Sequence, residues 1–123
     1  MDIDGNILWS VDTERDSYWT AISPNNDYIA FGSGSTVLNT SLFDKSGNHL
    51  WKSYSSYCGS FTSDGKRILI ASDDGIKLLN LKGTTLWADN TGIFTRFCAI
   101  TKDQSKIISA DTKGFLYIYK KTL

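Results

Sequence analysis

The sequence has little of what several chemistries require: among its 123 residues there are two cysteines, one histidine, one proline and one methionine. Two cysteines cannot form the disulfide scaffold that staples small secreted domains. The 13 basic residues equal the 13 acidic residues in number. Because a protein that neutralises phosphates needs a basic excess, no nucleic-acid partner is expected.

Long hydrophobic runs are also missing. The longest apolar stretches have four or five residues, as in Ile68–Ala71, whereas a transmembrane helix needs about 20. No basic start is followed by an apolar stretch, so neither a membrane span nor a signal segment is expected. With 41% hydrophobic residues the chain is still apolar enough to fold. These features predict a soluble single domain spanning residues 1–123, of unknown compartment, with reduced cysteines.

Internal repetition dominates what is present. Three tryptophans lie 42 and 36 residues apart, and each directly follows a leucine and stands four residues after a glycine. A second anchor recurs every 39 residues, at Ser23, Thr62 and Thr101, and opens a polar turn before a short apolar run. The recurring glycines and tryptophans, which we expect to be structural, are Gly5, Gly47, Gly83, Trp9, Trp51 and Trp87.

Each repeat divides into four short segments rich in branched and aromatic residues, separated by Gly, Asp, Asn and Ser. The most complete copy predicts strands at Cys58–Thr62, Arg67–Ser72, Ile76–Leu81 and Thr85–Ala88. No segment has the apolar stripe of a helix. Four short strands every 39 or so residues are typical of an all-β fold, the β-propeller.

The segment Asp44-Lys-Ser-Gly-Asn-His-Leu-Trp51 resembles the hairpin and tryptophan of PQQ-like propeller repeats, which are related to WD repeats and occur in quinoprotein dehydrogenases. The resemblance covers the whole chain, three times. The Trp-Asp and Gly-His pairs of the WD-repeat branch are absent. The acid, metal and adjacent cysteines with which quinoprotein enzymes bind their cofactor do not map onto this chain, so the resemblance implies no cofactor and no catalytic residue.

The register of the repeats predicts an assembly. The chain begins with one outer strand in residues 1–10, continues with blades at 17–52 and 57–90, and ends with three strands in 95–121. Three four-stranded blades cannot close a ring, because propellers have four to eight. We therefore predict a homodimer with six blades, in which Asn6–Ser10 pairs with Phe115–Lys120 of a second copy. The alternatives are a nine-bladed trimer and a piece of a longer propeller.

Other candidate chemistry has simple structural interpretations. Asp2–Asn6 looks like the start of a calcium loop but lacks the later acid, so we expect a plain turn and no metal. Cys58 and Cys98 take different register positions and should point to opposite faces of their strands; we expect free thiols. His49 has no acid or nucleophile nearby in the sequence. Trp19 breaks the tryptophan pattern and is expected in the core.

A binding site, if there is one, should lie at one rim of the ring. Loops between fourth and first strands, and between second and third strands, gather there, and loops on a rigid scaffold commonly carry function. The candidate rim residues are Asp12, Glu14, Arg15, Asp16, Tyr54, Tyr57, Asp73, Asp74, Asp89, Phe94, Asp111 and Lys113.

The function that these features favour is a non-catalytic interaction or ligand-sensing scaffold, with a protein or small ligand at the rim. The alternative is a self-assembling structural propeller, a fragment or an engineered repeat set, whose main behaviour is oligomerisation. A quinoprotein-type enzyme ranks third, and dye reduction after saturation with PQQ and calcium would identify one. Blade-level similarity cannot choose among these, because one fold serves many functions.

Overall fold

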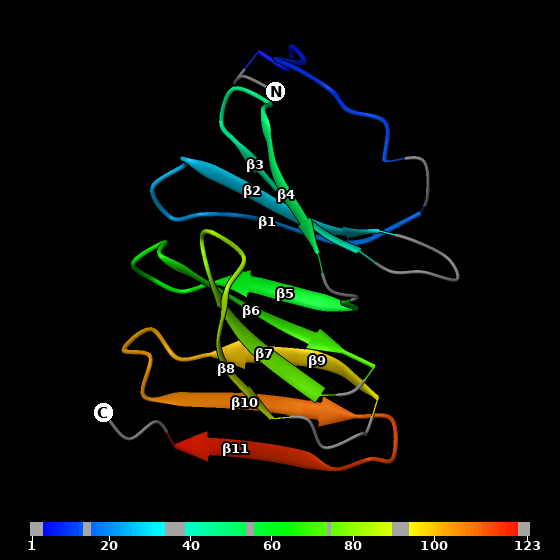
Figure 1. The fold of residues 1–123 in the computed structure, drawn as a ribbon, viewed down its shortest axis with the longest axis vertical. Coiled ribbons are helices and arrows are strands. Elements are labelled where there is room, and N and C mark those ends of the chain that lie inside the picture. Colours follow the sequence, from blue (N-terminus) through cyan, green and yellow to red (C-terminus); the bar gives the residue numbers. More distant parts are fainter. Residues whose placement is uncertain are drawn as a thin grey trace.

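A computed structural model describes residues 4–13, 16–33, 39–53, 56–73, 75–89 and 94–120 of the chain. These residues form three antiparallel sheets stacked one upon another (Figure 1). The prediction of an all-β fold is confirmed, and the described residues contain no helix. None of them could therefore cross a membrane as a helix.

The strands follow one another within each sheet, so neighbours in the sequence pair as hairpins. Sheet 1 has the order β1 (Ser17–Ile22), β2 (Tyr28–Ser33), β3 (Asn39–Asp44) and β4 (His49–Ser53). Sheet 2 has the order β5 (Cys58–Phe61), β6 (Arg67–Ser72), β7 (Gly75–Asn80) and β8 (Thr85–Asp89). Sheet 3 has the order β9 (Thr95–Ile100), β10 (Lys106–Asp111) and β11 (Leu116–Lys120).

The residues that were predicted to be an outer strand, Asn6–Ser10, belong to none of the three sheets. They run without regular structure along the side of sheet 1 that faces away from sheet 2 (Figure 1). Pairing of these residues with another copy of the chain stays a prediction.

The turns between first and second strands explain the 39-residue anchor. The Thr62 hydroxyl donates to the Asp64 carboxylate at 2.6 Å and accepts from the Arg67 amide at 3.2 Å. Thr101 makes the same two bonds, to Asp103 at 2.7 Å and from Lys106 at 3.1 Å. Ser23 likewise bonds Asn25 and accepts from the amide of Tyr28. A hydroxyl is thus required at each anchor to hold the turn. The turns also share a positive φ, at Asn26, Gly65 and Gln104.

The core lies between the sheets, and sheet 2 is covered on both faces. One cluster joins sheets 1 and 2 and consists of Ala30, Leu42, Ile68, Ile70 and Leu79, with Trp19 and Trp51 packed against it. The other joins sheets 2 and 3 and consists of Leu69, Ala71, Ile76, Leu78 and Ile107. Alternate residues of β6 therefore belong to different clusters, which is why its four central residues, Ile68–Ala71, are all apolar.

Candidate functional site

One end of the stacked sheets gathers an aromatic row. The start of each first strand lies beside the end of the second, as the pairings of Ser17 with Ser33 and of Thr95 with Asp111 show. At this end the Tyr18 and Tyr57 rings are 6.1 Å apart between centroids, edge to face. The Tyr57 and Phe94 rings are 4.2 Å apart. We call Tyr18, Tyr57 and Phe94 the aromatic row.

Charged groups flank this row. The Arg96 guanidinium carbon lies 6.0 Å from the Phe94 ring centroid, within the range of a cation–π contact. Burial raises the pKa of Tyr57, the nearby Asp73 carboxylate raises it further, and Arg96 opposes the increase. Tyr57 therefore stays a neutral hydrogen-bonding phenol near neutral pH. Flat faces beside a guanidinium and a carboxylate can stack on a ligand and hydrogen-bond to it, but they do not form a nucleophile with a base.

The structure brings some of the predicted rim residues to the row and places others elsewhere. Tyr57 and Phe94 form the row, and Asp73 lies close enough to influence Tyr57. Asp16 is exposed just before β1. Asp12 lines a hollow on the outer side of sheet 1. The predicted residues Glu14, Arg15, Tyr54 and Asp74 lie outside the described residues.

The remaining predicted rim residues have structural contacts. The Asp111 carboxylate accepts hydrogen bonds from the amides of Lys113 at 2.9 Å and Phe115 at 3.0 Å, which hold the turn between β10 and β11. Both bonds lower the pKa of Asp111, and the bond from the Phe115 amide has the larger effect. Asp89 of sheet 2 forms a hydrogen bond with Tyr119 of sheet 3. Burial is the main cause that raises the pKa of Tyr119 to about 12, and the hydrogen bond with Asp89 raises it further.

Two members of the site, Tyr18 and Arg96, were not among the predicted rim residues. A signal for them was present, because Tyr18, Tyr57 and Arg96 stand 39 residues apart and so share one register position. Phe94, by contrast, comes two residues before that position and reaches Tyr57 from the segment that precedes β9.

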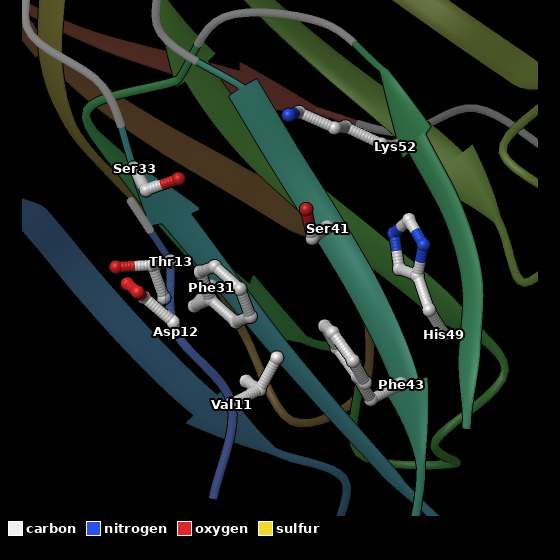
Figure 2. A pocket seen from close by; sticks show the side chains of 9 residues that line it. All are labelled: Val11, Asp12, Thr13, Phe31, Ser33, Ser41, Phe43, His49 and Lys52. Carbon is white, nitrogen blue, oxygen red and sulfur yellow. The ribbon is translucent and has the colours of Figure 1, made fainter. Parts of the chain in front are cut away.

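A hollow of about 270 Å³ lies on the outer side of sheet 1. Figure 2 shows the Phe31 and Phe43 rings on β2 and β3, with Val11–Thr13 on one side and His49 and Lys52 of β4 on the other. The His49 ring lies 4.9 Å from the Phe43 ring between centroids. The hollow thus has an aromatic floor and a polar border.

Two of the three repeated tryptophans make the same contact with a hairpin turn. The Trp51 indole nitrogen donates to the carbonyl of Leu81 at 2.8 Å, and its ring lies against Gly83. The Trp9 indole nitrogen donates to the carbonyl of Lys45 at 3.0 Å, and its ring lies against Gly47. Both glycines have positive φ, and a Cβ at Gly47 would press on the ring at 3.0 Å.

The third tryptophan lacks this contact. Trp87 is 37% exposed, and its ring packs edge to face with that of Tyr119 at 5.4 Å between centroids. At the opposite end of the chain, Gly5 has the same positive φ as Gly47, and a Cβ there would find nothing within 4 Å. The three tryptophans of the repeat are therefore not equivalent: Trp9 and Trp51 are half-buried against a turn, whereas Trp87 is exposed and its matching turn is missing among the described residues.

The first strands of neighbouring sheets meet through another repeated position. Trp19 of β1 lies so close to Gly59 of β5 that any side chain at Gly59 would collide with the indole. Its nitrogen donates to the Ser56 hydroxyl at 2.9 Å. One repeat later, Cys58 of β5 faces Cys98 of β9 in the same way, and both are free thiols.

The two cysteines are free thiols, as expected, and the structure places them against each other. Cys58 points out of sheet 2 toward sheet 3, and Cys98 points out of sheet 3 toward sheet 2. Opposite faces of two adjacent sheets are the faces that meet. Within the described residues, no group of three or more His, Cys, Asp or Glu side chains is placed to hold a metal ion.

No protein-family model matches the chain, and a search of curated proteins found no match.

Proposed function

We propose that the three sheets are blades of a β-propeller with PQQ-like repeats, that a second copy completes a six-bladed ring, and that the ring is a non-catalytic interaction scaffold. The observation that carries this proposal is the repeated contact between a tryptophan and the next hairpin turn, which is made twice within the chain and left open at both ends. The open tryptophan is Trp87 and the open turn holds Gly5.

The outer face of sheet 3 supports this assembly. Phe97, Leu116 and Ile118 are 66%, 66% and 63% exposed. By strand register, Leu116 and Ile118 match Ile76 and Leu78 of sheet 2, which sheet 3 buries. A face built like an inter-sheet surface but left in water is a site for association.

The outer face of sheet 1 offers the complement. Phe43 takes the register position of Tyr119, which packs against sheet 2 from sheet 3. The hollow beside Phe31 and Phe43 is then the space that sheet 3 of a second copy fills, with Trp87 seated on the turn at Gly5. Both junctions of a twofold ring are satisfied in this way, and six blades fall within the usual range.

The assembly is tested by the mass of the wild-type chain in sedimentation equilibrium at micromolar concentration. We expect twice the chain mass of 13.7 kDa. Trp87→Ala should shift the mass toward that of one chain. Leu86→Ser is the matched control, because Leu86 is exposed on the same strand and faces the other way. A monomeric wild type, or a Trp87→Ala protein that dimerises as tightly as wild type, would contradict the assembly.

We place the binding function at the aromatic row. Aromatic side chains with an adjacent arginine recur where proteins bind partners, because they contribute large contact areas at low entropic cost. A random peptide library selected against the immobilised protein should yield binders. Tyr57→Ala and Arg96→Ala should weaken those binders at least tenfold, whereas Lys102→Ala, in the turn at the opposite ends of these strands, should not.

The alternative, in which self-assembly is the whole function, is favoured by the same exposed end faces. It would be supported by a protein that dimerises as expected but yields no peptide whose binding depends on Tyr57 or Arg96.

A further inference from the structure

The two cysteines of the chain lie against each other across the junction of sheets 2 and 3. The Cys58 Sγ lies 4.0 Å from the carbonyl oxygen of Cys98, and the Cys98 Sγ lies 3.9 Å from the carbonyl oxygen of Cys58. Each sulfur therefore reaches the main chain of the other residue. This reciprocal contact brings β5 and β9 together at the distance of a pair of short side chains.

The junction of sheets 1 and 2 fills the equivalent position with different side chains. At the equivalent position, Trp19 lies directly on Gly59, where there is no room for a Cβ. One large and one minimal side chain fill that gap, whereas Cys58 and Cys98 fill the next gap with two small ones. A disulfide requires Cα atoms about 4.4–6.8 Å apart and side chains that point toward each other, and the facing cysteines satisfy the second condition.

The two thiols differ in chemistry. The interaction with the Cys98 side chain lowers the pKa of Cys58 to about 6, against the opposing effect of burial. The same interaction, together with burial, raises the pKa of Cys98 well above its usual value. The thiolate, which is the nucleophile, therefore forms more readily on Cys58 than on Cys98.

We propose that Cys58 and Cys98 are a reversible thiol-modification site, with Cys58 as the reactive cysteine, Cys98 as the resolving cysteine and a small-molecule disulfide as the oxidant. The site lies within one chain and does not depend on the proposed ring. Closing it would join sheets 2 and 3 covalently.

The reaction proceeds in two exchange steps. The Cys58 thiolate attacks one sulfur of the small disulfide, whose S–S bond breaks and releases one thiolate, leaving a mixed disulfide on Cys58. Cys98 then loses its proton to solvent and attacks the Cys58 Sγ, which releases the second small thiolate. Both released thiolates take up protons as their pKa requires. The protein pair loses two electrons and the small disulfide gains them, becoming two thiols.

Oxidised glutathione is the probe for this site. Wild-type protein incubated with it should lose the mass of two hydrogens, lose both titratable thiols and remain a single chain in a non-reducing gel. Dithiothreitol should restore both thiols. A protein that carries one or two stable glutathione adducts, that forms only disulfides between chains, or that does not react would overturn the proposal.

Single variants separate the two roles. Cys98→Ala should stop at one stable glutathione adduct on Cys58, and Cys58→Ala should react at least tenfold more slowly than wild type. In wild type, the alkylation rate of Cys58 should rise to half its plateau near pH 6, and Cys98→Ala should move this midpoint to higher pH. A midpoint that does not move would show that Cys98 does not act on Cys58. The wild-type mass experiment still decides if either variant fails to fold.

Discussion

Sheets 2 and 3 have similar apolar faces in opposite surroundings. Leu78 of sheet 2 is buried under sheet 3, whereas its register equivalent Ile118 is 63% exposed on the outer side of sheet 3. Trp51 packs on the turn at Gly83, whereas Trp87 packs on no such turn among the residues that the structure describes. The comparison shows that the sequence of each repeat gives its sheet an apolar face. The position of the sheet in the stack decides whether a neighbouring sheet covers that face.

The largest effect should come from the tryptophan contact between sheets. Trp51→Ala removes an indole packed on the first core cluster and a hydrogen bond to Leu81. We expect a loss of about 3 kcal/mol in the free energy of unfolding, the low end of the range for Trp→Ala in a core, because Trp51 is half-buried. Chemical denaturation measures it. If the comparison holds, Trp87→Ala should cost far less at protein concentrations too low for dimers.

The next prediction compares the two faces directly. Leu78→Ala should lower the free energy of unfolding by about 2–5 kcal/mol, because it leaves a cavity in the second core cluster. Ile118→Ala should change the free energy of unfolding of the monomer by less than about 0.5 kcal/mol, as substitutions at exposed sites do. The same variant should weaken the dimer, as measured by sedimentation equilibrium. Equal losses of stability for the two variants would remove the distinction between an inner and an end sheet.

A smaller effect tests the close approach of first strands. Gly59→Ala places a Cβ against the Trp19 ring, and such overpacking typically costs about 1–3 kcal/mol. Thr20 is the register equivalent of Gly59 on the exposed side of sheet 1, so Thr20→Ala is the control and should be nearly neutral in thermal unfolding. A neutral Gly59→Ala would mean that Trp19 does not rest on this glycine in solution.

The smallest effect compares the turns of the three sheets in acid. The pKa of Asp64 is lowered to about 2, mainly by the hydrogen bond from the Thr62 hydroxyl. The pKa of Asp103 is likewise lowered to about 2, mainly by the hydrogen bond from the Thr101 hydroxyl. Because these values lie below the usual carboxyl value of about 4, both ionised groups stabilise the fold above that pH. This contribution is lost as the pH falls through about 2.

The melting temperature should therefore fall between about pH 4 and pH 2. The double variant Asp64→Asn with Asp103→Asn should fall less steeply, since it gives both turns the amide that Asn25 already supplies in sheet 1. Asp16→Asn is the matched control at an exposed site. An unchanged slope in the double variant would count against the contribution of these turns.

Much of the fold could be predicted from residues close together in the sequence. The hydroxyl anchors are turn residues that bond amides four or five positions away, and short-range bonds leave a short-range signature. The apolar run Ile68–Ala71 has no alternation, as is typical of a strand covered on both sides. The contact of Cys58 with Cys98 was not predicted, because opposite pleat faces within single strands do not tell which faces of adjacent sheets meet.

The candidate site was predicted in part. Tyr57 and Phe94 were identified from the topology of the loops, whereas Tyr18 and Arg96, which the structure places on strands β1 and β9, were missed because their shared register position was not used. Asp111 looked like a rim ligand, yet its carboxylate holds its own turn. An acid in a turn has the same sequence signature in either role.

By itself the sequence determined the strands, the turns and which faces of each sheet are apolar, because these depend on alternation and on contacts within a few residues. The tertiary structure decided which faces meet: Trp51 lies on Gly83 and Cys58 against Cys98, whereas Phe97 stays 66% exposed on the outer face of sheet 3. The physical reason is that stacking joins residues about 40 positions apart, and each sheet can cover only the face that its neighbour presents.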